Sequence, residues 1–451
     1  MMRAFLECFS TEAKKRGIGH FRFHAEESER HAFNVYEGEL EKYTVSRETL
    51  LCIEGEVDGR IGTAYTEKFA DAGEGIPDQP LIASLVENIR QTAGSNGIPY
   101  TEKPLGDLAL PDDDETEPEG GWVTEQLIAA ENEAFETDPR VAKVSRCGFS
   151  SEVRKIVLQD QSGRRMEDRL RCLEARVSVM VRDGDRVQTA AVHGLSHRGD
   201  LDLRKLAVKA AAEAAAMLPA ESLPGGRRPV VIRGDVFCEL LYAYLPLFYA
   251  DRVQSGTSLM KGKLNQSVAA PMVNLYEDPT SGGGTAARRF DDEGTPTQTS
   301  SIIDGGYLAT YLHNLKTARA SGIASTGNGF RRMYRENVAV SATNIVLWGG
   351  KAGLPELIRS ARDGVLVTHC DGIFAGANVF SGDFSLISRG FLIEGGKVTR
   401  PAHRFTIGGN FFDLLHGVSA LGDDYFTTGH IRCSVRTPSV LVKKLLISGR
   451  E

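Results

Sequence analysis

The sequence lacks the features that hold a small secreted protein together or anchor a protein in a membrane. Its 451 residues contain seven cysteines, an odd and widely scattered set without a CxxC pair, so the chain is not built on a disulfide framework. The longest apolar run, residues 240–250, is about half the length that spans a bilayer and contains Pro246. Residues 1–16 predict an amphipathic helix without the apolar segment of a signal peptide. We therefore expect a protein of the reducing cytoplasm with no membrane partner.

An excess of positive charge is absent as well. Lys and Arg number 53 against 60 Asp and Glu, which gives a formal net charge of −7. Because nucleic-acid binding depends on many contacts of Lys and Arg with phosphates, this balance predicts no nucleic-acid partner. The sequence also contains no GxSxG nucleophile motif, and no Walker phosphate-binding loop follows a predicted strand.

Glycine, in contrast, is abundant, with 48 residues where an average chain of this length has roughly 32. Tight hairpins need residues that adopt positive φ, which glycine does without steric cost. Three dipeptides of this kind stand between strand-like segments: Asp58-Gly59, Gly305-Gly306 and Gly395-Gly396. We predict hairpins at all three and an α+β fold with antiparallel sheets.

The order helix, strands, helix occurs twice in the first half of the chain. Ser28-Glu29 recurs as Ser151-Glu152, and the run from Arg60 recurs from Arg186. This period is too long for a solenoid, so we interpret it as a diverged duplication of an αββββα-like unit, with chance similarity as the alternative. The two copies share one sheet or pack face to face. The predicted parts are an N-terminal α+β unit (1–97), an acidic, proline-rich linker or loop (98–121), a second α+β unit (122–222) and a mostly β C-terminal domain with a few helices (223–451).

Two loops of the C-terminal domain gather charged and small residues. Segment 288–297, RRFDDEGTPT, places three carboxylates and two arginines directly before a hairpin. In one interpretation, the carboxylates accept backbone N–H bonds around Gly294 and fix a turn, and the arginines neutralise their charge. In the other, the loop binds a peptide backbone or a cation. Segment 325–331, STGNGFR, would let a ligand's backbone approach closely, or would form a turn and nothing more.

Histidine and cysteine pairs offer possible metal ligands. His369, Cys370, His430 and Cys433 lie on predicted β segments, and together they would suit zinc. Adjacent residues of a strand point to opposite faces, so His369 and Cys370 reach one ion only through a bulge, and we expect separate structural roles. His20 and His24 are spaced four apart on a strand without an HExxH motif, and we expect them to be exposed or hydrogen-bonded.

The run RRFDDEGTPTQTSSIIDGGYLATYLHNLKTARASGIASTGNGFR resembles the signature region of the TldD/PmbA family, cytoplasmic proteins named as modulators of DNA gyrase and as peptide-processing proteases. GELE at residues 38–41 and VDGRIGTAYT at 57–66 resemble the family's N-terminal pattern. Its C-terminal pattern is matched by GVLVTHCDG, SGDFSLISRGFLIEGGKV, FTIGGNFFDLL and SVLVKKLLISG. The resemblance covers nearly the whole chain.

The resemblance implies two branches. TldD carries HExxxH on a helix plus a C-terminal cysteine as zinc ligands and general base, whereas PmbA, also called TldE, lacks the motif and pairs with TldD. The equivalent helix here lies in VVIRGDVFCELLYAYLPLFYAD, and no histidine occurs from residue 198 to 312. Glu239 is the acid of this degenerate helix, and we expect Tyr242, Ala243 and Leu247 where the donors would stand. Cys433 falls near the third ligand, but one thiolate alone is a poor zinc site, so we expect no cofactor and no catalytic residue.

The family resemblance therefore implies a PmbA/TldE-like, non-catalytic subunit of a TldD-type zinc metalloprotease that acts in proteolysis and peptide maturation. Its partners would be a TldD-like subunit or a second copy in a dimer, and a peptide or unfolded polypeptide as substrate. A self-sufficient metal-dependent peptidase using the four His and Cys donors, and a homodimeric binding or scaffold protein, are the alternatives. The substrate-channel candidates are Arg289, Asp291, Asp292, Glu293, Gly294, Gly327, Asn328, Gly329 and Arg331.

Overall fold

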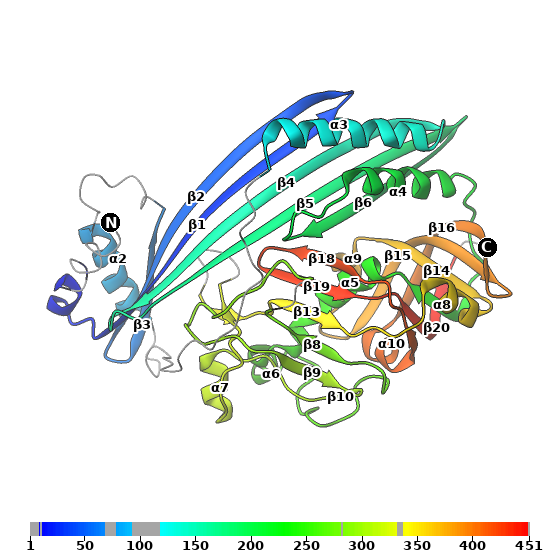
Figure 1. Ribbon diagram of the computed structural model, residues 1–451. Helices are drawn as coiled ribbons and strands as arrows, with labels where there is room; N and C mark the ends of the chain where they lie inside the picture. The colour runs from blue at the N-terminus through cyan, green and yellow to red at the C-terminus, as the bar shows by residue number, and fades with distance from the viewer. Residues whose placement is uncertain are drawn as a thin grey trace.

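The computed structural model describes residue 9 and residues 11–67, 78–92, 118–280, 283–331 and 337–449. They form an α+β molecule in which a long, twisted antiparallel sheet lies across a mostly β C-terminal region, as predicted (Figure 1). Most of the predicted linker, including its acidic run up to residue 117, lies outside the described part of the chain. Within the described ranges, no helix is long and apolar enough to cross a membrane.

The long sheet contains the predicted duplication. Its strands follow the order β3-β2-β1-β4-β5-β6, and they are β1 (His20–Tyr36), β2 (Glu39–Val57), β3 (Arg60–Thr66), β4 (Val141–Asp160), β5 (Arg165–Asp183) and β6 (Arg186–Ser196). Val57 pairs with Arg60 across one hairpin, and Asp183 pairs with Arg186 at the equivalent place in the other. Both copies therefore share one sheet.

Each copy supplies three long strands rather than the four short strands expected. The sequence predicts separate strands over 20–26 and 32–38, with a break at the polar stretch 27–31 between them. In the structure this polar stretch continues as part of β1. It pairs with β2 on one side and with β4 on the other, so its backbone groups have partners on both sides without a turn.

The two faces of the long sheet have different partners because side chains alternate along a strand. Odd-numbered residues of β1 face helices: Phe23 packs in a core with α2, and Phe33 packs in a core with α3 and α4. Even-numbered residues 22–26 face the C-terminal region instead. The helices are α2 (Asp78–Gln91), α3 (Gly120–Thr137) and α4 (Leu203–Ala216).

The C-terminal region contains two six-stranded sheets and one two-stranded pair. The first sheet has the order β10-β9-β8-β13-β19-β18, with β8 (Leu275–Glu277), β9 (Ser300–Asp304), β10 (Tyr307–Leu308), β13 (Asn344–Leu347), β18 (Phe426–His430) and β19 (Cys433–Thr437). The second has the order β16-β15-β14-β7-β20-β17, with β7 (Gly226–Ile232), β14 (Gly364–Asp371), β15 (Asp383–Glu394), β16 (Lys397–Asn410), β17 (Val418–Leu421) and β20 (Val440–Ser448). The pair is β11 (Gly329–Phe330) with β12 (Ala339–Val340).

In the described part of the chain, seven shorter helical elements join or cover these strands. They are α5 (Gly234–Tyr244), η1 (Leu245–Phe248), α6 (Ala250–Gln254), α7 (Leu315–Ser321), α8 (Leu354–Ala361), α9 (Ile373–Gly376) and α10 (Phe411–Gly417), η1 being a 3₁₀ turn that continues α5. The predicted Gly-Gly hairpins are confirmed: both glycines of each pair have positive φ, and they connect β9 to β10 and β15 to β16.

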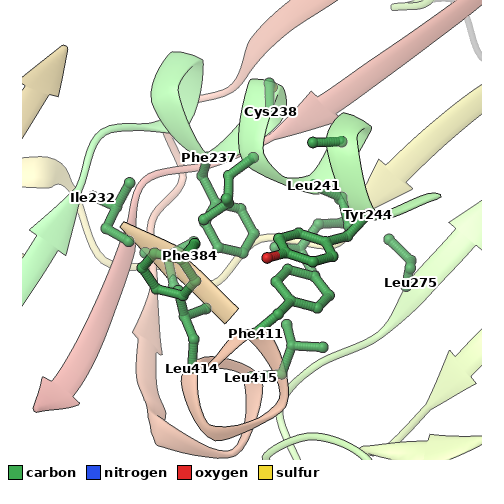
Figure 2. Close-up of a cluster of buried hydrophobic side chains, with 14 of the residues drawn as sticks. Ile232, Phe237, Cys238, Leu241, Tyr244, Leu275, Phe384, Phe411, Leu414 and Leu415 are labelled. Atoms are coloured by element: carbon green, nitrogen blue, oxygen red, sulfur yellow. The ribbon is translucent and has the colours of Figure 1, made fainter. Parts of the chain in front are cut away.

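Helix α5 lies within the core of the C-terminal region (Figure 2). Tyr244 stacks on Phe411 with ring centroids 4.2 Å apart, and its hydroxyl donates to the carbonyl of Asp383 at 2.8 Å. From the sequence alone, Asp235 is the expected N-cap of this helix, because aspartate is a preferred cap residue, and that expectation is wrong. The first helical bond runs from the N–H of Phe237 to the carbonyl of Arg233, so Arg233 is the N-cap and Asp235 lies inside the first turn.

Candidate functional site

A cavity of about 200 Å³ lies where the long sheet meets the C-terminal region. The sheet contributes Arg154 from β4 and Leu170 from β5, and the C-terminal end of α5 contributes Tyr242. The turn between β18 and β19 contributes residues 430–433. The loop before β9 contributes Arg288 and Asp292, and Arg331 directly follows β11. The cavity is therefore assembled from segments far apart in the sequence.

The wall formed by α5 contains the helix that the sequence resemblance matched to the family's zinc-motif helix. Tyr242 lines the cavity, and its hydroxyl lies 3.1 Å from Nε2 of His430. Ala243 and Leu247, which were expected to stand where metal donors would be, are buried in the apolar core instead. Glu239 is exposed and does not line the cavity. Of the four residues selected on this helix, the structure brings only Tyr242 to the cavity.

The side chains around this cavity do not fit a zinc ion. His430 and Cys433 line it, but His369 pairs with Asp371 at 3.0 Å, and Cys370 Sγ lies 3.3 Å from the hydroxyl of Ser388. Zinc sites in proteins use three or four His, Cys or carboxylate donors. Among the residues that the structure describes, no three such donors are grouped so that they could hold a metal ion.

The loop before β9 is a turn held by a buried carboxylate. One oxygen of Asp291, Oδ1, accepts the N–H groups of Glu293 at 3.0 Å and Thr295 at 2.8 Å. The other oxygen, Oδ2, accepts the N–H of Gly329 at 2.8 Å and so joins this turn to β11. The turn interpretation of segment 288–297 is thereby confirmed. Asp291 itself has no exposed surface.

Asp292, the next residue, connects the same two loops from the cavity side. Its Oδ1 pairs with Nη2 of Arg288 at 3.0 Å, and its Oδ2 accepts the N–H of Arg331 at 2.8 Å. Burial opposes its charged form, but His24 and the arginine beside it hold the pKa of Asp292 below its usual range. Asp292 and Arg331 line the cavity.

Most of the other substrate-channel candidates are internal. Arg289 binds Asp168 of β5, with Nε 2.8 Å from Oδ1, and Glu293 Oε2 accepts the N–H of Leu315 at 2.7 Å. The amide of Asn328 donates to both carboxylate oxygens of Glu277, at 2.8 and 2.7 Å. Burial raises the pKa of Glu277 to about 7. Gly294, Gly327 and Gly329 are backbone positions of the two loops and do not line the cavity.

The residues missed by the sequence reasoning are the charged side chains of the long sheet. Glu26 of β1 pairs with Arg154 of β4 and, at 2.8 Å, with Arg432 of the β18–β19 turn. Glu54 of β2 pairs with Arg331 at 3.1 Å. The alternation of charged and apolar residues in HFRFHAE was visible, but alternation of this kind normally places charges in solvent. Only the docking of the C-terminal region makes this face internal.

His24 lies at the centre of this charged layer. It is 4% exposed, and neither ring nitrogen has a hydrogen-bond partner among the residues that the structure describes. The expectation that it is exposed or hydrogen-bonded is therefore wrong, because the C-terminal region covers its face of the sheet. Its nearest carboxylate oxygens lie 3.7 Å away on Asp292 and 3.8 Å away on Glu26. Burial outweighs these two charges and lowers the pKa of His24 to about 4.

The lowered pKa of His24 predicts a loss of stability in acid. In the unfolded chain the group takes up a proton near pH 6.5, whereas the folded protein resists protonation until about pH 4. The free energy of unfolding should therefore fall through this interval, by up to about 3 kcal/mol from this residue. In His24→Gln the fall should be shallower by that amount. Denaturant unfolding of both proteins from pH 7 to pH 4 measures the difference, and parallel profiles would contradict the prediction.

The fold and the cavity define a class of protein. A duplicated long sheet covers a mostly β domain, and a core helix meets a C-terminal strand that carries a cysteine. Residues 225–449 match the model of the PmbA/TldA metallopeptidase C-terminal domain, and residues 112–218 match that of the PmbA/TldA metallopeptidase central domain. The chain belongs to the PmbA/TldD family, as its motifs predicted.

Relatives in both branches are similar to this chain. A metalloprotease TldD homolog of Haemophilus influenzae is 27% identical over 314 residues, which cover 66% of this chain and 64% of that protein, just under two thirds of its length. A metalloprotease PmbA homolog of Buchnera aphidicola is 26% identical over 328 residues, covering 71% and 69%. Among solved structures, a Thermotoga maritima protein described as a modulator of a DNA gyrase has a TM-score of 0.86 at 26% identity and covers 99% of this chain and 100% of that one.

Proposed function

We propose that this protein is a PmbA/TldE-like subunit that does not cleave peptides itself and that assembles in the cytoplasm with a TldD-type zinc metalloprotease acting in peptide maturation. The observation that carries the proposal is the chemistry of the cavity wall. Where the resemblance places HExxxH in the catalytic branch, α5 presents Tyr242 to the cavity and buries Ala243 in the core, and Leu247 of η1 is buried there too. Tyr242 and His430, which are hydrogen-bonded to each other, do not make up the three or four donors of a zinc site that would activate a water molecule.

Membership of the family supports a role in proteolysis, and the similarity of the whole scaffold to a solved structure supports a role that needs its shape. An α5 helix without donors still packs through Tyr244 against Phe411 and closes the core. A chain that keeps this architecture without the ligands is suited to form one wall of a chamber whose chemistry comes from the other subunit.

Mixing the purified chain with an HExxxH-bearing homologue tests the proposal. We expect a stable complex by size-exclusion chromatography with light scattering, and at least tenfold faster cleavage of an unfolded peptide than with either chain alone. The zinc content of the isolated chain should stay below about a tenth of an equivalent after metal-replete purification, because structural zinc binds too tightly to be lost.

The matched control replaces the motif glutamate of the homologue by glutamine, which should abolish cleavage while leaving the complex intact. Cleavage that persists in this complex would place catalysis in the present chain and overturn the proposal. So would chelator-sensitive cleavage by the chain alone. A stable symmetric homodimer that binds no homologue would support the scaffold alternative instead.

A further inference from the structure

The cavity beside α5 has a positively charged lining. Four guanidinium groups, those of Arg154, Arg288, Arg331 and Arg432, face the single carboxylate of Asp292. Three of the four arginines are more than nine-tenths buried, at 2%, 7% and 5% exposure, and Arg432 stands at the more open β18–β19 turn. Because the four arise from separate parts of the chain, their convergence is a property of the assembled fold.

The carboxylates that hold these arginines lie behind them. Glu26, which pairs with both Arg154 and Arg432, is 3% exposed and does not line the cavity. Glu54 pairs with Arg331 and also with a second arginine, on β1, at 2.9 Å. Asp168, which is also buried and does not line the cavity, pairs with Arg288 at 3.4 Å and with Arg289 at 2.8 Å. Each of these three carboxylates therefore serves two guanidinium groups. With the positive groups in front and the shared negative groups behind, the field inside the cavity favours an anion.

Two further acids, Asp291 and Glu293, lie in the adjoining loop and do not line the cavity. Burial raises the pKa of Asp291, and the neighbouring Glu293 raises it further. Burial likewise raises the pKa of Glu293. The carboxylate of Asp291 is already engaged by three backbone N–H groups, so it faces the loop rather than the cavity.

The rest of the lining is mostly apolar and aromatic, with Ser341 and His430 as its polar members. Leu170, Leu245 and Ile431 lie beside the arginines, and the rings of Tyr249 and Phe330 complete the walls. A space of about 200 Å³ is smaller than the 300–1,000 Å³ typical of small-molecule sites, so it has room for about one residue. A ligand that fits must carry a negative group close to an apolar one. Arginine's planar fork matches the two oxygens of a carboxylate.

We propose that this cavity binds the C-terminal residue of a peptide, with its carboxylate on the arginines and its side chain against the aromatic walls. In a C-terminal residue, the ionised carboxylate and the side chain are attached to the same Cα, so a negative group lies close to an apolar one, as the lining requires. An internal Asp or Glu of a peptide fits less well, because the peptide chain on both sides of that residue would have to pass through the same small space. The preference for a carboxylate rests on the cavity alone, and the identification of the ligand as a peptide rests on the proposed function.

Calorimetry on the isolated, full-length chain at low salt tests this with N-acetyl-Ala-Ala-Phe. The peptide acid should bind, and its C-terminal amide should bind at least about tenfold more weakly, since a hydrogen bond to a charged group is lost. Arg432→Gln should weaken binding of the acid by about tenfold, because Arg432 is the most accessible of the four. Arg436→Gln is the matched control: Arg436 stacks on Tyr425 outside the cavity, and its replacement should leave binding unchanged.

Three results would overturn the proposal: no binding of the acid, equal binding of acid and amide, or binding of the amidated peptide N-acetyl-Ala-Glu-Phe as tightly as the free acid. If inorganic phosphate bound and the peptide acid did not, the cavity would be an anion site, and the proposal of a peptide ligand would be rejected. The comparison of acid with amide uses the unaltered protein, so it decides the question even if Arg432→Gln does not fold. None of these measurements involves the metalloprotease subunit, so a failure here is separate from a failure to form the complex.

Discussion

Asp291→Ala is expected to lower the free energy of unfolding by about 3–6 kcal/mol, the largest effect that we predict for a single side chain. The carboxylate accepts three backbone N–H bonds, from Glu293, Thr295 and Gly329, at a site without exposed surface. Alanine leaves those three donors buried without partners, and each costs about 1–3 kcal/mol. Denaturant unfolding followed by circular dichroism measures the change.

Asp291→Asn is the control for this prediction. Asparagine keeps the shape and one carbonyl oxygen, which can still accept the N–H groups of Glu293 and Thr295 across the turn. Its amide nitrogen faces the N–H of Gly329 and cannot accept it. We expect a loss of about 1–3 kcal/mol, clearly smaller than for alanine. Equal losses in the two variants would show that the negative charge, rather than the backbone hydrogen bonds, stabilises the loop.

Gly327→Ala should destabilise the protein by about 3–5 kcal/mol for a different reason. The residue has φ of +77°, where a side chain costs about 1–2 kcal/mol. An added Cβ would also lie 2.5 Å from the carbonyl oxygen of Pro296 and 2.8 Å from Cα of Thr297. Both contacts are with backbone, so the two loops would have to move apart.

Gly322→Ala separates these two causes. Gly322 ends α7 with φ of +65°, but nothing lies within 4 Å of the position that its Cβ would occupy. This variant should lose only about 1 kcal/mol, the cost of the backbone conformation. If Gly327→Ala were no worse than Gly322→Ala in the same unfolding measurement, the close packing of the loops would not contribute to stability.

Local features of the fold were predictable because short stretches of sequence cause them. The hairpins at Asp58-Gly59, Gly305-Gly306 and Gly395-Gly396 need positive φ, which those residues adopt readily. Asparagine is a preferred cap residue, so the sequence favours a helix start at Asn410, and its side chain does accept the N–H of Phe412 and cap α10. The number of strands in each repeat was not predictable, since the continuity of β1 depends on pairing with β4, more than a hundred residues away.

The candidate site was predicted less completely. The sequence pointed to the charged loops and to the helix without zinc ligands, and the structure places parts of both at one cavity through Asp292, Arg331 and Tyr242. It did not point to Glu26 or Arg154, because a strand that alternates charged and apolar residues usually turns its charges to solvent.

The sequence by itself determined the family, the α+β class, the tight turns and the absence of HExxxH from α5, since these depend on the order and identity of neighbouring residues. Only the tertiary structure decided that the charged face of the long sheet is internal and that four arginines meet around one cavity. The physical reason is that an ion pair between distant strands and loops forms only when the packing of the C-terminal region removes that face from water. Glu26 and Arg432 form such a pair although they lie about four hundred positions apart, and no local sequence pattern predicts it.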